Sequence, residues 1–162
     1  MTEREKRLHR CAFTGHRPEK LRVPKERVCE LLEEEIRLAV DDGMNVFITG
    51  MARGVDIWAA NIVFRLRSGN SNIKLICAPP YEGFESRWSE ENQNDYRLIL
   101  EYADLVRYIC PRYSPDCFQR RNEWMVDHAN RLIAVWNGLP SGTANTVRYA
   151  QSQEVDTRII KV

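Results

Sequence analysis

The sequence has no long hydrophobic run, and this lack limits where the protein can act. No stretch approaches the roughly 18 apolar residues that a membrane span requires, so we expect no membrane partner. The N-terminal segment MTEREKRLHR is charged, and no apolar signal-peptide core follows it before Gly15. We therefore expect a cytoplasmic protein whose residues 1–8 form a flexible charged tail.

A large excess of either charge is also absent. The 24 Lys and Arg residues nearly balance the 23 Asp and Glu residues, and the formal net charge is +1. A balanced domain has no general attraction for polyanions, which argues against a nucleic-acid partner. A local anion-binding site is compatible with this balance, and so is a homodimer.

Cysteine patterns typical of metal sites or disulfide frameworks are missing as well. The five cysteines are Cys11, Cys29, Cys77, Cys110 and Cys117, an odd number with no CxxC or Cys/His ligand spacing. We expect no zinc site, no other metal and no disulfide. Cys11, Cys77 and Cys110 lie in apolar runs, where cysteine commonly packs as a small buried hydrophobe.

Two alternating patterns fill the 162 residues, which is the usual length of one domain. Short apolar runs predict buried strands at 11–13, 46–48, 73–77, 105–106, 132–136 and 159–160. Apolar stripes predict helices over 28–40 and 55–66, with weaker helical patterns near 86–103, 116–130 and 143–153. This alternation predicts a single α/β domain over 1–162. It is Rossmann-like and doubly wound, with a mainly parallel sheet of five to six strands and helices on both faces.

The segments that follow the predicted strands carry most of the small and polar residues. In a parallel sheet these segments gather at the carboxyl edge, where ligands bind. We therefore place in a ligand-binding site Thr14, Gly15, His16 and Arg17 after the first strand, Gly50, Met51, Ala52, Arg53 and Gly54 after the second, Pro79 after the third, and Ser141, Gly142 and Thr143 after the fifth.

The stretch FITGMARGVD, residues 47–56, raises the question of why a strand should turn so tightly into a helix. Glycines let backbone amides approach a ligand, and a helix N-terminus favours anions, so 50–54 and 141–143 are candidate phosphate cradles. A purely structural turn, with Asp56 complementing the helix dipole, is the alternative. The stretch matches neither the dinucleotide-binding nor the Walker glycine pattern.

Several arginines strengthen the case for an anionic ligand. Arg17 and Arg53 lie in the strand-end segments, and Arg120 and Arg121 lie near the start of a predicted helix, where the dipole disfavours cations. Each could be an ordinary solvated arginine. As a set they favour a phosphate, which guanidinium groups bind well.

Longer motifs resemble a known family. CAFTGHRPEKL at 11–21, FITGMARGVDIWAA at 47–60, RNEWMVD at 121–127 and LIAVWNG with SGTANTVRYA at 132–150 resemble the YpsA-like family of the SLOG superfamily. That superfamily contains Rossmann-like relatives of DprA and the LOG phosphoribohydrolases. The resemblance implies a pocket for a nucleotide-derived ligand, such as an ADP-ribose-like or NAD-related molecule. The sequence does not establish a cofactor.

The resemblance also implies roles for individual residues. Its motifs support Gly15, His16, Arg17, Gly50, Ala52, Gly54, Gly142 and Thr143, and they add Asp56, Trp88, Arg121 and Asn122 to the ligand-binding set. Where the family usually has two glycines, this chain has Ser141 and Gly142, which could add a hydroxyl donor. Trp88 either stacks on a base or packs in the core.

A second departure from the family pattern bears on catalysis. The LOG hydrolases, which this family resembles, share a glutamate that assists N-glycosidic cleavage. In this chain Thr146 occupies the corresponding position. Any acid or base must come from elsewhere, and the candidates are Asp56, His16 and Glu123. Each has an ordinary alternative: a helix-dipole partner for Asp56, a hydrogen-bond donor for His16 and a solvated first-turn acid for Glu123.

Three functions are compatible with these features. The leading hypothesis is a binding or sensing module for a small nucleotide or nucleotide derivative, because the cradle features are present and a complete catalytic set is not. The second is a hydrolase acting on the glycosidic or phosphoester bond of a nucleotide, and turnover of labelled substrates would distinguish it. The third, by analogy with DprA, is single-stranded nucleic-acid binding, which the balanced charge disfavours.

Overall fold

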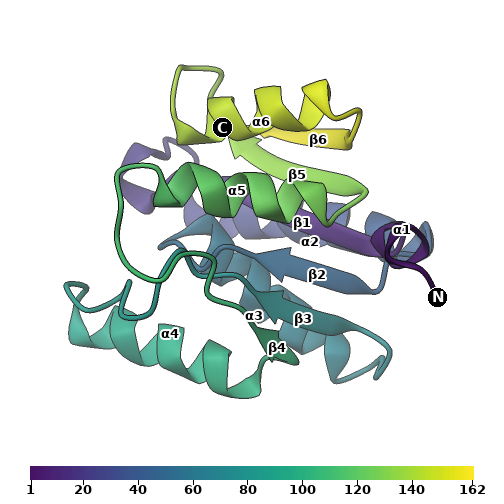
Figure 1. Ribbon diagram of the computed structural model, residues 1–162, viewed down its shortest axis with the longest axis horizontal. Coiled ribbons are helices and arrows are strands. Elements are labelled where there is room, and N and C mark those ends of the chain that lie inside the picture. The colour runs from purple at the N-terminus through teal and green to yellow at the C-terminus, as the bar shows by residue number, and fades with distance from the viewer.

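The computed structural model describes residues 1–162 as one parallel sheet covered by helices on both faces (Figure 1). The six strands are β1 (Arg10–Gly15), β2 (Val46–Thr49), β3 (Lys74–Cys77), β4 (Leu105–Val106), β5 (Arg131–Trp136) and β6 (Asp156–Lys161). They lie in the order β4-β3-β2-β1-β5-β6, and every neighbouring pair is parallel. The predicted doubly wound α/β fold is confirmed.

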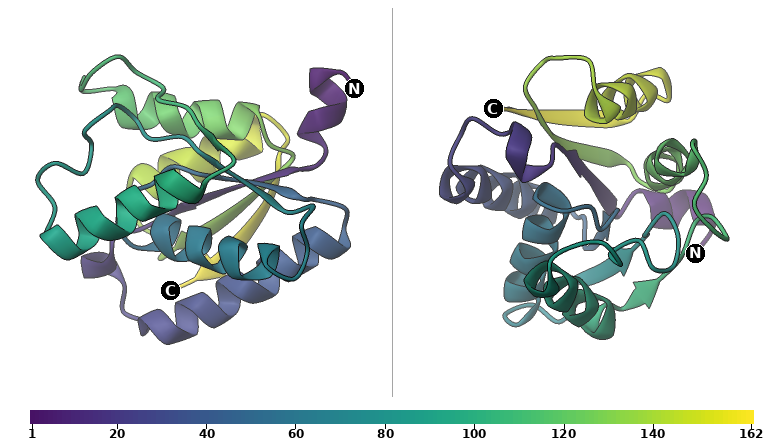
Figure 2. Two further views of the ribbon diagram at one scale, coloured as in Figure 1. Left: turned by 90° about the horizontal axis from the view of Figure 1, so that it is seen from below. Right: turned by 90° about the vertical axis from the view of Figure 1, so that its left-hand side faces the viewer.

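Seven helical segments accompany the strands. They are α1 (Glu3–Arg7), the short 3-10 helix η1 (Pro18–Lys20), α2 (Lys25–Asp41), α3 (Val55–Arg67), α4 (Glu90–Tyr102), α5 (Cys117–Asp127) and α6 (Gly142–Ser152). All but α1, which precedes β1, lie between two strands. Helices α2 and α3 cover one face of the sheet and α5 and α6 the other, as the two views of Figure 2 show. Helix α4 packs beside α3 near the β4 edge.

Alternation along the central strands divides the core into two layers. In β1, Cys11 and Phe13 join the larger apolar cluster beneath α2 and α3, whereas Ala12 between them joins the smaller cluster beneath α5 and α6. Phe13 stacks on Phe47 of β2 with ring centroids 6.0 Å apart. Successive strand residues point to opposite faces, so both sides of this sheet are buried.

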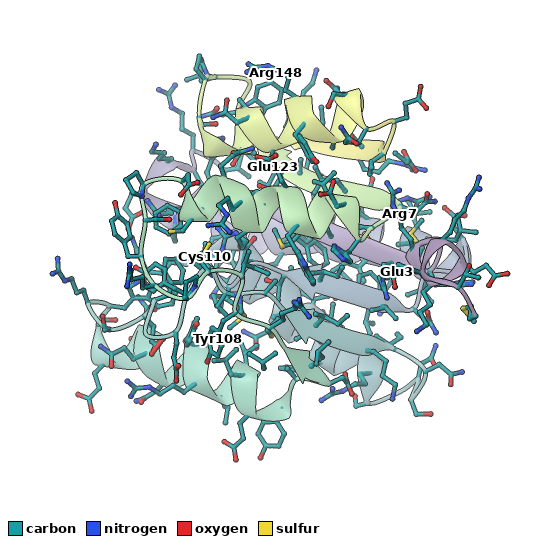
Figure 3. The ribbon with its side chains drawn as sticks, in the orientation of Figure 1. Glu3, Arg7, Tyr108, Cys110, Glu123 and Arg148 are labelled. Carbon is teal, nitrogen blue, oxygen red and sulfur yellow. The ribbon has the colours of Figure 1, made fainter.

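Residues 1–8 differ from the flexible tail that we expected, because residues 3–7 form helix α1. Thr2 caps this helix: its side chain accepts the Glu5 amide, while the Glu5 carboxylate accepts the Thr2 amide. The Arg10 guanidinium pairs with Glu3 at 2.5 Å, and Arg7 Nε donates to the Ala129 carbonyl at 2.9 Å. Figure 3 shows Glu3 and Arg7 on this helix.

Two further features of the helices bear on the expectations. The predicted helix near 86–103 begins only at Glu90, because Ser89 caps it by accepting the Asn92 amide at 3.2 Å. The helices of this fold are too short or too polar to cross a bilayer.

The strand order fixes where a ligand can bind. From β1 the chain runs through α2 toward β2 and β3, whereas from β5 it runs through α6 in the opposite direction to β6. The segments after β1 and β5 therefore diverge although the two strands are neighbours. Such a switch point opens a crevice at the carboxyl edge of a parallel sheet.

Candidate functional site

A cleft of about 270 Å³ lies at this switch point, and we call it the β1/β5 cleft. Its lining comes from the segment after β1, the start of α3, the first turns of α5 and the start of α6. The lining residues are Thr14, Gly15, His16, Arg17, Lys20, Ala52, Asp56, Phe118, Arg121, Asn122, Ser141, Gly142 and Thr143. Eleven of these thirteen are among the predicted ligand-binding residues.

The N-terminus of α6 forms one wall of the cleft. Ser141 caps the helix, because its Oγ accepts the Ala144 amide at 3.1 Å. The amides of Gly142 and Thr143 belong to the first turn and have no acceptor within the helix. A side chain at Gly142 would have no heavy atom within 4 Å of its Cβ, so this wall is open. A free helix N-terminus facing open space suits an anion.

Arg121 forms the floor of the cleft, where α5 meets the end of β2. It is only 5% exposed, and its Nη1 donates to the Gly50 carbonyl while its Nε donates to Asn122 Oδ1 at 2.7 Å. Burial lowers the pKa of the guanidinium, and the carboxylate of Asp56 opposes that shift. Arg121 thus supplies a fixed positive charge beneath the cleft.

Asp56, in the first turn of α3, is the only carboxylate in the lining. Its Oδ2 accepts the Ala52 amide at 3.1 Å, and its buried Oδ1 has no hydrogen-bond partner. Burial raises the pKa of Asp56 from 3.8 to about 6, against the opposing effects of Arg121 and Arg17. The cleft therefore contains a carboxyl group that changes charge just below neutral pH.

The segment between β2 and α3 answers the question raised by FITGMARGVD. A Cβ on Gly50 would come within 2.8 Å of the Arg121 side chain, and Gly54 has φ +90° and lies against Pro18. A side chain at either position would therefore clash with other residues of the protein. Of residues 50–54 only Ala52 lines the cleft, while Met51 is fully buried in the core despite a φ of 65°.

The other two candidate acids or bases have different surroundings. His16 is buried, and its Nε2 accepts the Asn137 amide at 3.1 Å, which places the ring proton of a neutral imidazole on Nδ1. Burial lowers the pKa of His16, so the neutral ring is favoured. Glu123 is half-buried on the α6 side of α5 and does not line the cleft (Figure 3). Asp56 is thus the one candidate acid that lines the cleft and keeps a buried oxygen without a hydrogen-bond partner.

Cations surround the mouth of the cleft. Arg17 and Lys20 are exposed, and Arg17 also lines a neighbouring groove of about 370 Å³ that contains Arg53 and Trp88. Arg53 is paired with Glu19 at 2.6 Å. Arg17 is the cation that lines both the cleft and the neighbouring groove.

Trp88 fits both of its predicted roles in part. Its ring makes edge contacts with Phe84 and Tyr96, each with centroids 5.2 Å apart, and so belongs to the core. It also lines the groove beside Arg17 and remains half-buried. Trp88 therefore lies next to the cleft and outside it.

The remaining predicted residues support the cleft from behind or lie apart from it. Pro79 is buried two residues after the end of β3, and its carbonyl accepts the Ile109 amide at 3.1 Å. Conversely, Lys20 and Phe118 line the cleft and were not predicted. Phe118 lies three residues before Arg121 on α5, so helical spacing could have identified it.

A larger groove of about 580 Å³ lies elsewhere, between α2 and α3. Three of its seven charged residues pair with one another, as Glu33 does with Arg37 at 3.1 Å and with Arg65. Its lining includes Lys25 and Glu26 at the start of α2, but it contains four glutamates against one lysine and two arginines, a balance that disfavours an anion. The charges of the two linings favour the smaller β1/β5 cleft over this groove as a site for an anion.

A parallel sheet whose switch point carries a cationic cleft at a helix N-terminus defines a Rossmann-like protein with a site suited to anions. Comparison with known families narrows this class. The model of the YspA SLOG family (YpsA) matches residues 11–161, and the chain belongs to that family. The family resemblance noted in the motifs is thereby confirmed.

Individual relatives agree with this assignment. The chain is 31% identical over 134 residues to a UPF0398 protein of Bacillus cereus (strain B4264), covering 78% of this chain and 73% of that protein. A UPF0398 protein of Bacillus thuringiensis (strain Al Hakam) gives the same identity and coverage.

Two solved structures share the fold. DNA processing protein A from Helicobacter pylori superposes with a TM-score of 0.65 at 18% identity, over 97% of this chain and 66% of that one. DprA from Streptococcus pneumoniae gives a TM-score of 0.67 at 16% identity, over 96% and 51%. This chain thus spans about two thirds of the Helicobacter pylori chain and about half of the Streptococcus pneumoniae chain. At these identities the likeness shows the fold.

Proposed function

We propose that this protein is a binding or sensing module for a small, phosphate-bearing, nucleotide-derived molecule, held in the β1/β5 cleft. The observation that carries the proposal is the meeting of the free α6 N-terminus with the cations of Arg17, Lys20 and Arg121 in one cleft. Free helix amides and guanidinium groups both bind phosphate oxygens well.

The dimensions of the site indicate which part of a nucleotide it would hold. The cleft, at about 270 Å³, is smaller than most pockets for drug-sized ligands, which are roughly 300 to 1,000 Å³. It would hold the phosphates and part of a ribose. The adjoining groove, reached past Arg17, offers Trp88 and Phe84 to an aromatic base.

A charge placed at Gly142 tests the proposal without disturbing the fold. Aspartate in the first turn of a helix is favoured by the dipole, so Gly142→Asp should fold at least as stably as the wild type. The same carboxylate would repel an anion and fill the open wall. We expect calorimetric titration with ADP-ribose and AMP to show binding by the wild type and a loss of at least tenfold in Gly142→Asp.

Gly142→Asn is the matched control, because it adds nearly the same volume without the charge. It should bind more tightly than Gly142→Asp. If neither compound binds the wild type, or if Gly142→Asp binds as well as the wild type, the cleft is not the phosphate site.

A pair of arginine variants tests the cationic rim. Arg17→Gln should weaken binding by about 1 to 3 kcal/mol, the usual value of a charge-assisted hydrogen bond, and the loss should shrink as salt rises. Arg120→Gln, at an exposed arginine of α5 outside the cleft, should leave affinity unchanged. Equal effects of the two substitutions would indicate general attraction rather than a site.

One observation favours hydrolysis of a nucleotide as a second candidate function. Asp56 places a buried carboxyl group with a raised pKa in the cleft, as general acids and bases often require. The LOG glutamate is missing, however, and Thr146 donates its hydroxyl to the Gly142 carbonyl at 2.9 Å. We expect no release of base from labelled nucleoside monophosphates. Turnover that Asp56→Asn abolishes would establish the hydrolase instead.

Single-stranded DNA is the ligand named for the Helicobacter pylori structure, and it is the third candidate here. Exposed Arg17, Lys20, Arg22 and Arg87 line the cleft and the grooves beside it. A strand bound along them would release counterions, so its affinity would fall steeply with salt. Labelled oligonucleotides that bind more tightly than ADP-ribose at physiological salt would favour this function over ours.

A further inference from the structure

We propose that Asp56 takes up a proton from solvent when an anion enters the β1/β5 cleft, so that the site binds its ligand together with one proton. This inference rests on the proposed function and adds a proton to the binding reaction. The proton forms an O–H bond at the Asp56 carboxylate, and the bound form then has a neutral carboxyl group.

The two oxygens of Asp56 have unequal surroundings. The Ala52 amide already occupies Oδ2, whereas Oδ1 is buried without a partner in the wall of the cleft. An ionised carboxylate in that position has nothing to donate and repels any anion beside it. A protonated carboxyl removes the repulsion and gains an O–H donor.

The charged groups around Asp56 cannot hold it ionised once an anion is present. From α5 it faces Arg121, which already donates to Gly50 and Asn122. From the segment after β1 come Arg17 and, elsewhere in the cleft lining, the titratable His16 and the cation Lys20. Helix α6 contributes only uncharged groups to the lining.

Before any ligand binds, these opposing effects place the pKa of Asp56 close to neutral pH. Burial raises the pKa of Asp56 to about 6 despite Arg121 and Arg17. A bound anion draws on the same two arginines and adds a like charge, so it must raise that pKa further. At about pH 7 the free site is mostly ionised, and the occupied site gains the proton.

The consequence is a ligand affinity that depends on pH. Between the pKa values of the free and occupied sites, the association constant should fall by up to about tenfold for each unit of rising pH. A ligand with two or more phosphate charges would raise the pKa of Asp56 most. The site would then respond to both the ligand and the acidity of its surroundings.

Calorimetric titration with ADP-ribose provides the test, because its pyrophosphate has no group that titrates near neutral pH. Titrations at about pH 7 in bis-Tris and in Tris, which are cationic buffers of different ionisation enthalpy, count the protons taken up. We expect the wild type to take up close to one proton. Asp56→Asn should take up none and bind with little dependence on pH, because an amide does not titrate near neutral pH. Its side-chain oxygen can still accept the Ala52 amide, which preserves the local structure.

The His16→Gln variant separates the two titratable groups of the cleft. Its side-chain oxygen can still accept the Asn137 amide, and proton uptake should persist. Binding by the wild type without proton uptake would overturn this inference alone, as would uptake that Asp56→Asn retains and His16→Gln loses. If ADP-ribose binds none of the three proteins at any pH, both the inference and the proposed function fail.

Discussion

Gly54 shows how a glycine in a motif can be required by packing within the protein. Its φ of +90° strains any other residue, and a Cβ there would lie 2.8 Å from Pro18 Cδ and 3.2 Å from the His16 carbonyl. The motif leaves two roles open for this glycine, access of a ligand to the backbone and a purely structural turn. In the structure it brings the start of α3 against the segment after β1.

A comparison with Gly43 tests this packing role. Gly43 has a similar φ of +94°, but nothing lies within 4 Å of its Cβ position. Alanine at either position should cost about 1 kcal/mol or somewhat less from backbone strain. Gly54→Ala should cost at least 1 kcal/mol more, because Pro18 and His16 must move. Urea denaturation measures both values, and equal losses would contradict the packing role.

The raised pKa of Asp56 predicts how the stability of the protein depends on pH. A group whose pKa is raised by folding stabilises the folded state below its unfolded value, and that contribution is lost as pH rises through the folded value. For Asp56 the loss runs from pH 3.8 to about 6 and amounts to about 3 kcal/mol.

Asp56→Asn should lack this contribution to the pH dependence. The free energy of unfolding of the wild type should fall relative to that of the variant between about pH 4 and pH 7. Denaturation at a series of pH values gives the difference directly. A difference that is constant across this range would show that Asp56 is not perturbed by burial.

At the scale of single elements, α6 matters most because its first turn forms a wall of the cleft. Ser141 caps α6 and Ser89 caps α4 through similar hydrogen bonds, at 3.1 and 3.2 Å to the third amide of each helix. Loss of such a cap costs about 1 kcal/mol. The two helices therefore offer a matched pair of variants.

Ser141→Ala and Ser89→Ala should lower the free energy of unfolding by similar amounts, about 1 kcal/mol each. Only Ser141→Ala should also weaken the binding of ADP-ribose, because the amides of Gly142 and Thr143 lose their fixed orientation. Thermal melts and calorimetry measure the two effects separately. A loss of affinity in Ser89→Ala as large as in Ser141→Ala would argue that α6 has no special part in binding.

How far the elements could be predicted varies with the kind of signal. The apolar stripe of 55–66 predicts α3 closely, because periodic burial is the strongest signal in a sequence. Helix α1 was missed, because two reciprocal hydrogen bonds at Thr2 and contacts with Ala129 and Arg10 hold a polar segment that has no apolar stripe.

At the scale of the whole molecule, the parallel sheet follows from continuous apolar strands, but the strand order does not. The connection from β4 to β5 places β5 beside β1, and no pattern in the sequence predicts that placement. It brings Arg121 of α5 beneath Gly50 and Asp56. Composition and motifs therefore predicted most members of the cleft, while the pairing between them needed the fold.

The switch point also explains why a protein of net charge +1 can have a site for anions. Arg17 and Lys20, which follow β1, meet Arg121 of α5 at the cleft, whereas acidic residues gather elsewhere, for example along α2. The local electrostatic field in a cleft, rather than the net charge of the protein, decides where a small anion binds.

The measurement that tests the central claim most directly is the location of a bound nucleotide derivative. Titration of the ¹⁵N-labelled protein with ADP-ribose, followed by amide NMR, reports the backbone amides of all residues other than proline in one experiment. We predict the largest shifts at the amides of Gly142, Thr143 and Ala52 and near Arg17. Shifts confined to the groove between α2 and α3, around Trp58 and Glu33, or no shifts at millimolar ADP-ribose, would contradict the account.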